Sequence, residues 1–292
     1  MKVKKMLSFV LMMVLLACLP VLAEEGEDAL AAAALTADTA AQIDLDGDGT
    51  PEQVLWRSTV VGEYQDETVQ VEVTSADGET AIWTSDLLWG AQVYAVDLDS
   101  DGKTELFISG DEMSDDYVTF CLRYEGGELV QLLFADANRG DNTDGYYLSG
   151  YGEAVLLGDN RITLCGSQDV LGTYMSNRTF TLKNGRFEFA DDGLWHMVWQ
   201  ADGADSWEYG ALTLKQPLDV TFTADGTETA GTLNAGEQLR VTASDKVSVV
   251  YFETPDGRTG YFGIMDDFEN GWGSLVNGVS EEEMFEFLPY AD

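Results

Sequence analysis

The chain has little of the chemistry on which most nucleophilic and transition-metal sites depend. Its 292 residues include one histidine and three cysteines. Without a second histidine there is no zinc site of the histidine-rich kind, and a serine triad would have to use His196. Neither a phosphate-binding loop nor a dinucleotide fingerprint occurs. We therefore predict no catalytic residue, and we expect His196, in "LWHMVW", to lie beside aromatic side chains in a strand.

Positive charge is also scarce. Fifteen Lys and Arg stand against 53 Asp and Glu, for a formal net charge of −38. Binding to nucleic acid is disfavoured, because that affinity rests on neutralising phosphates with basic side chains. Anionic membranes and wall polymers should be repelled as well, unless a divalent cation bridges the two surfaces.

Only the N-terminus carries a long apolar run. "MKVKKMLSFVLMMVLLACLPVLA" has three lysines, an apolar core and a small-residue end, which predicts a secretory signal peptide over residues 1–23. The alternative treats "LLAC" as a lipoprotein box with Cys18 lipidated. No other stretch is long enough to cross a bilayer, so we expect an exported protein, secreted or at the cell surface, with no transmembrane segment in the mature chain.

Two cysteines remain after such processing, Cys121 and Cys165. In "YVTFCLRY" the alternation puts Cys121 on the same, more polar face as Thr119 and Arg123, and Cys165 shares a polar face with Thr163. Export permits a disulfide between the two cysteines, and two free thiols are the alternative. The sequence leaves this open because it does not show proximity.

What the chain does have is β-sheet character. Apolar residues make up 45% of it, "TVQVEVT" (68–74) alternates strictly, and "KNGRFEF" (183–189) is typical of a tight hairpin. Helical periodicity is confined to "SEEEMFEFL" (280–288), where Ser280 and Glu283 fit a capping box. We predict an all-β fold with a short C-terminal helix.

One acidic pattern occurs twice, as "DLDGDGTPE" (44–52) and "DLDSDGKTE" (97–105). Carboxylates at alternate positions of a tight loop can turn inward around a hard cation such as Ca²⁺, and Gly permits the bend. An EF-hand would need a twelfth-position Glu, where Leu55 and Ile108 stand instead. The candidate metal ligands, including the main-chain carbonyls of Thr50 and Lys103, are Asp44, Asp46, Asp48, Thr50 and Glu52, and Asp97, Asp99, Asp101, Lys103 and Glu105.

This pattern, followed by an apolar strand, resembles the FG-GAP and VCBS-type repeats of integrin-like propellers. The resemblance implies Ca²⁺ as cofactor, about two ions in all, with each loop locking two strands together. The 53-residue offset between the loops suits one four-stranded propeller blade. Residues 43–208 hold only about three such periods, and the stretch near residue 150 has no acidic loop. A propeller-like and incomplete repeat domain is therefore expected, with a compact four-blade version as the alternative.

The pattern of strands and turns in the sequence changes near residue 209. "GTLNAGEQLRVTASD" followed by "VSVVYFETPDGRTGYF" resembles bacterial SH3-like domains, which are small barrels of exported proteins. We expect four segments: a signal peptide (1–23), a flexible Ala- and acid-rich linker (24–42), a calcium-binding β repeat domain (43–208), and an SH3-like barrel with the short helix (209–292).

These features favour a bacterial, exported, non-enzymatic calcium-binding protein with structural ions. It would act as a binding or adhesion module for a protein or glycan at the cell surface, and it would be a monomer. The alternative is an exported carbohydrate- or wall-active hydrolase that uses acidic residues of the repeat domain. Among so many acids, no particular catalytic pair is singled out.

Overall fold

The structure is a computed structural model. It describes residues 32–61, 66–86, 88–112, 116–135, 144–145, 148–150, 154–190, 192–198, 210–224, 226–266 and 273–290. The predictions of a signal peptide and of a lipidated Cys18 lie outside these residues. The described chain consists of strands, turns and one four-residue helix, so the all-β prediction is confirmed.

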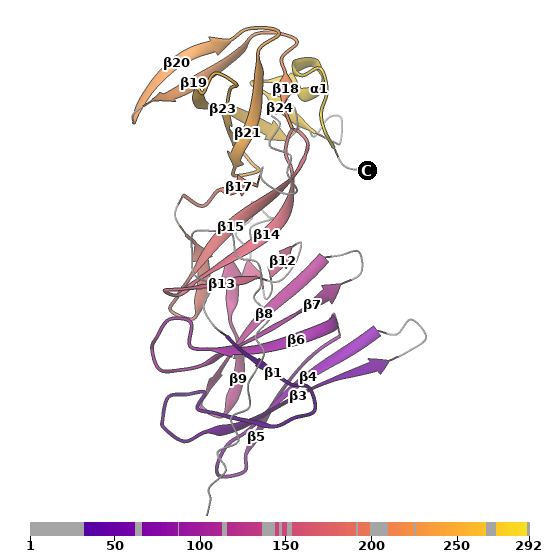
Figure 1. Ribbon diagram of the computed structural model, residues 1–292, viewed down its shortest axis with the longest axis vertical. Coiled ribbons are helices and arrows are strands. Elements are labelled where there is room, and N and C mark those ends of the chain that lie inside the picture. Colours follow the sequence, from indigo (N-terminus) through magenta and orange to yellow (C-terminus); the bar gives the residue numbers. More distant parts are fainter. Residues whose placement is uncertain are drawn as a thin grey trace, which may run out of the picture.

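Two consecutive four-stranded antiparallel meanders form the N-terminal part (Figure 1). The first runs in chain order through β2 (Ala41–Ile43), β3 (Glu52–Val61), β4 (Asp66–Thr74) and β5 (Thr80–Ser85). The second runs in the same order through β6 (Trp89–Val96), β7 (Glu105–Glu112), β8 (Asp116–Glu125) and β9 (Glu128–Gln131). Two further strands extend the second sheet, β1 (Ala33–Leu35) beside β6 and β12 (Leu148–Gly150) beside β8.

A third antiparallel meander follows the same plan. It runs through β13 (Val155–Gly158), β14 (Arg161–Asp169), β15 (Thr173–Lys183) and β16 (Arg186–Phe189). Beside β16 lie β10 (Leu133–Ala135) and then β11 (Asp144–Gly145). The predicted hairpin joins β15 to β16, with Asn184 at φ 53° and Gly185 at φ 74°, the positive values that such two-residue turns require.

The second meander is packed on both faces. Its Val93, Ile108 and Phe120 join Val54, Val71 and neighbouring side chains of the first meander in one buried cluster. Its Phe107 and Cys121 point the other way, into a cluster with side chains of the third meander. Cys121 shares its face with Thr119 and Arg123 as expected, but the third meander covers this face and all three residues are buried. A strand buried on both sides has no solvent face, so alternation within it does not mark burial.

Part of the expected linker over residues 24–42 is ordered sheet. Ala33 pairs with Ala95, and the carbonyl of Leu35 accepts a 2.9 Å hydrogen bond from the indole N–H of Trp56. The described half of this segment is thus built into the first two sheets rather than being a free tether. Small alanine side chains suffice for a strand whose backbone bonds to its neighbour β6.

The C-terminal part contains the remaining strands and the helix. These are β17 (Trp195–Met197), β18 (Leu212–Thr213), β19 (Leu218–Ala224), β20 (Thr227–Leu233), β21 (Gln238–Ser244), β22 (Val249–Glu253), β23 (Thr259–Asp266), β24 (Ser274–Val276), β25 (Val279–Ser280) and α1 (Glu281–Met284). Ser280 caps the helix, because its side chain accepts a bond from the N–H of Glu283. The expected short helix is present.

The core of this C-terminal part is shared with the third meander, whose Val170, Leu171 and Tyr174 lie in the same buried cluster. The C-terminal strands pair in the order β21-β22-β23-β19-β20 around this cluster, which includes Val241, Phe252 and Phe262. β17 pairs with β15 on one side and β21 on the other, so hydrogen bonds cross the boundary expected near residue 209. Among the described strands, the pairings close neither a barrel nor a propeller ring.

Candidate metal centre

The two acidic loops occupy the same place in successive meanders. Each joins the first strand to the second, β2 to β3 and β6 to β7. Their backbones also match: the fourth loop position has positive φ (Gly47 76°, Ser100 58°), as does the sixth (Gly49 87°, Gly102 88°). Two left-handed residues within three positions coil the chain tightly, which is the bend expected from the sequence.

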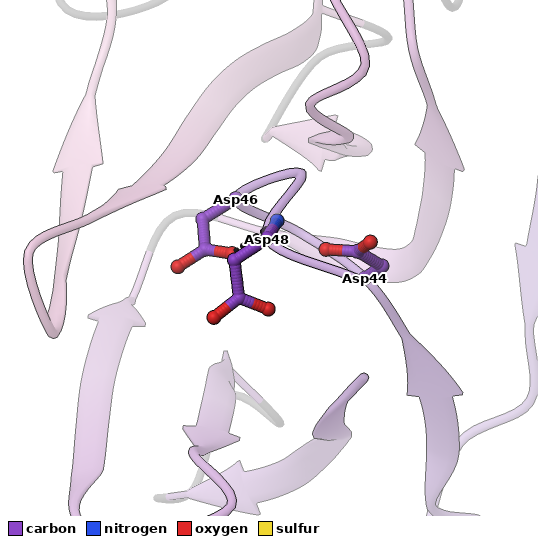
Figure 2. Close-up of side chains that lie close together, drawn as sticks. All are labelled: Asp44, Asp46 and Asp48. Atoms are coloured by element: carbon purple, nitrogen blue, oxygen red, sulfur yellow. Dashed lines mark hydrogen bonds between the residues drawn. The ribbon is translucent and has the colours of Figure 1, made fainter. Parts of the chain in front are cut away.

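The three aspartates of each loop converge. One carboxylate oxygen from each of Asp44, Asp46 and Asp48 lies within 4.8 Å of the others, and so do those of Asp97, Asp99 and Asp101. Figure 2 shows Asp46 and Asp48 side by side, with Asp44 facing them across the loop. At such separations each pair of like charges repels by about 1 to 3 kcal/mol, depending on the local dielectric.

Backbone amides hold the first and fifth positions of each loop in place. In the first loop, Gly47 N and Gly49 N each donate a 2.9 Å bond to Asp44, and Thr50 N donates to Asp48. In the second loop, Asp101 N and Gly102 N donate to Asp97, and Lys103 N donates to Asp101. The main-chain carbonyls of Thr50 and Lys103 remain predicted ligands.

The ninth-position glutamates fasten the base of each loop. Glu52 accepts a 2.8 Å bond from the N–H of Leu45, and Glu105 accepts a 3.0 Å bond from the N–H of Leu98. Both glutamates are buried, at 4% and 0% exposure. The structure thus gives them a bond to the second loop position and leaves them outside the aspartate groups, so their metal-ligand role stays a prediction.

Burial dominates the electrostatics of both glutamates. It raises the pKa of Glu52, opposed by the Leu45 bond and assisted by the nearby charge of Asp46. Burial also raises the pKa of Glu105, opposed by the Leu98 bond and by Arg123. Burial therefore disfavours the charged form of the glutamate at the base of each loop, an effect that a nearby cation would oppose.

The second loop has a cationic partner that the sequence analysis did not identify. Arg123, on β8, contacts the buried Glu105 through Nε at 2.9 Å and through Nη2, and its Nη2 lies 3.3 Å from Asp99 Oδ2. Its Nη1 is 4.0 Å from Asp101. The other oxygen of Asp99, Oδ1, is buried and has no hydrogen-bond partner. In the sequence, Arg123 is visible as a single basic residue within an apolar strand. Its pairing with Glu105 follows only from the register between β7 and β8.

The two loops also contact each other. Thr104 N donates a 3.0 Å bond to the carbonyl of Leu45, and its hydroxyl donates to the carbonyl of Asp44. A Cβ built on Gly47 would lie 2.7 Å from the carbonyl oxygen of Gly102, so this approach needs glycine. One meander further on, Asn160 N bonds to the carbonyl of Leu98 in the same way, from a short turn in place of an acidic loop.

His196 lies away from these loops and is not packed among aromatics as expected. Its neighbours Trp195 and Met197 are buried, whereas the His196 side chain is 56% exposed and lies 3.1 Å from Asp192. Strand alternation turns it outward. Among the residues that the structure describes, no disulfide joins Cys121 to Cys165.

In the described part of the chain, no helix is long and apolar enough to cross a membrane.

Comparisons with protein-family models, with curated proteins and with solved structures found no match to this chain.

Proposed function

We propose that this chain is an exported, calcium-stabilised β-repeat protein that acts as a non-enzymatic binding module at the cell surface or in the medium. The observation that carries the proposal is the duplication: two successive meanders present three converged aspartates in the same loop position. Solvent-exposed turns without a bound ion would not be expected to repeat a mutually repulsive group of carboxylates at matched positions.

The donor set fits Ca²⁺. Carboxylate oxygens are hard ligands, and Ca²⁺ takes about six to eight oxygens in flexible geometry, whereas Mg²⁺ favours fewer carboxylates and more water. The buried, unpartnered Asp99 Oδ1 is the kind of oxygen that a cation would satisfy. The proposed ligands are the aspartates of each loop, the Thr50 and Lys103 carbonyls, and Glu52 and Glu105.

In this proposal the ion holds the fold, and the ligand-binding surface lies elsewhere. Each loop connects two strands and contacts the next meander, so neutralising its charge would stabilise both the sheet and the packing between sheets. A propeller-like arrangement of the meanders and an SH3-like C-terminal domain are part of the same proposal. They are supported by the repeated strand order and by the C-terminal sheet β21-β22-β23-β19-β20 with its buried cluster.

The test is the thermal unfolding of the mature chain, residues 24–292, in EDTA and then in excess Ca²⁺. At a hundredfold excess over Kd, binding to the folded state alone adds about 2.7 kcal/mol, and we expect Tm to rise by about 5 °C or more. The control is the variant carrying Asp46→Asn, Asp48→Asn, Asp99→Asn and Asp101→Asn, whose Tm should not respond. Equal melting temperatures of the wild type in EDTA and Ca²⁺ would overturn the proposal.

A further inference from the structure

The acidic loops share a backbone but differ in the charge around them. The second loop is in contact with the guanidinium of Arg123 on β8, whose side chain is 8% exposed. The first loop has no such partner: within the described residues, no ion pair joins Asp44, Asp46, Asp48 or Glu52 to a lysine or arginine.

Strand register explains the difference. On β8, Arg123 follows Leu122, which pairs with Leu106, so Arg123 stands opposite Glu105. On β4, Thr74 pairs with Gln53, and the residue that follows it opposite Glu52 is Ser75. The hydroxyl of Ser75 donates to Asp77 and to the carbonyl of Glu79 rather than to the loop.

We propose that Arg123 is a built-in counter-ion of the second acidic loop, which makes the first loop the tighter Ca²⁺ site. This inference rests on the proposed function. A fixed positive charge in contact with Glu105 and Asp99 lowers the attraction of that loop for a second cation. Arg123 does not saturate the loop, because Asp99 Oδ1 and the carboxylate of Asp97 are not engaged by it.

The same contact gives the second loop a means of keeping its shape without an ion. Arg123 joins Glu105 on β7 to Asp99 and Asp101 in the loop, and Glu105 in turn holds the N–H of Leu98. Within the described residues, the carboxylates of the first loop are held by backbone N–H groups and not by an arginine. The first loop packs against the second loop through Thr104. The second loop, held in shape by Arg123, therefore supports the first loop where that loop binds its ion.

Isothermal titration of the metal-free mature protein with Ca²⁺ tests the inference, using two double variants. We expect two classes of site in the wild type, separated by about tenfold or more in Kd, the equivalent of about 1.4 kcal/mol. Asp46→Asn with Asp48→Asn should abolish the tighter class, and Asp99→Asn with Asp101→Asn should abolish the weaker class. Loss of the tighter class from the second-loop variant would overturn the inference.

Arg123→Gln provides the direct readout. It should tighten the weaker class by about tenfold and bring the two classes together. The matched control is Arg57→Gln, which removes an arginine that pairs with Glu72 on the first meander and should leave both classes unchanged. Unchanged affinities in Arg123→Gln would overturn the inference.

Three further outcomes are separable. If Arg123→Gln does not fold, the two double variants decide the question by themselves. If the wild type binds no Ca²⁺, the proposed function fails and this inference fails with it. If the wild type binds two ions with equal affinity, only the inference about Arg123 fails.

Discussion

Replacing Gly47 by alanine tests whether the two acidic loops support each other. Gly47 has φ 76°, and a Cβ there would lie 2.7 Å from the carbonyl oxygen of Gly102 and 3.2 Å from its carbon. Both atoms belong to the backbone of the second loop, so no side-chain rotation relieves the contact. Either the loops separate or the first loop changes conformation.

Gly49 is the matched control for this change. It lies in the same loop with φ 87°, but a Cβ there meets nothing within 4 Å. Both alanine variants carry the cost of a left-handed residue with a side chain, about 1 to 2 kcal/mol. Gly47→Ala should cost a further 1 kcal/mol or so, because displacing the second loop weakens the bond from Thr104 N to the carbonyl of Leu45.

Urea unfolding in EDTA measures the difference, with tryptophan fluorescence as the signal because Trp56 and Trp83 pack between the first two sheets. The midpoint should fall further for Gly47→Ala than for Gly49→Ala. Ser100→Gly, at the matching position of the second loop (φ 58°), should change stability by no more than about 0.5 kcal/mol. Equal losses in the two alanine variants would refute the view that the loops are in supporting contact.

Two other predictions follow from buried or hydrogen-bonded groups. Burial raises the pKa of Cys121 well above that of an ordinary thiol, so iodoacetamide should label this residue only after denaturation. The intact mass should show both Cys121 and Cys165 reduced. Labelling of Cys121 in the native protein at neutral pH would contradict its burial. Burial tends to raise the pKa of Asp245, but bonds from Ser248, Val249 and Val247 outweigh it and lower the pKa. The stability from this depressed pKa is present above the ordinary aspartate value and lost as pH falls below about 4, so Asp245→Asn should lower Tm at pH 6 and have little effect at pH 3. An Asp245→Asn effect on Tm that is constant with pH would count against the assignment.

Much of the local structure followed from the sequence. Alternation in "TVQVEVT" gave β4, Asn184 and Gly185 gave the hairpin between β15 and β16, and Ser280 gave the helix cap. The convergence of three aspartates in each loop was also predictable. Glycine allows the chain to bend tightly, and side chains at alternate positions of such a loop turn toward its centre.

Burial was predicted less well, since it depends on what covers each sheet. Cys121 reads as a residue on a polar face, yet the third meander covers that face and buries it. Residues 33–35 read as part of an alanine-rich tether, yet β6 offers them an open edge and they pair with it. In both cases the deciding neighbour lies tens of residues away in the chain.

Local sequence is enough to specify the strands, the tight turns and the two acidic loops, because these depend on side-chain alternation and on backbone conformations that span a few residues. The difference between the two loops arises from contacts between residues that are distant in the chain. Strand pairing brings Arg123 to Glu105 and leaves Ser75 opposite Glu52, and packing of successive meanders sets Gly47 against Gly102. Charge compensation acts across space, so two loops with nearly the same sequence have different electrostatic surroundings.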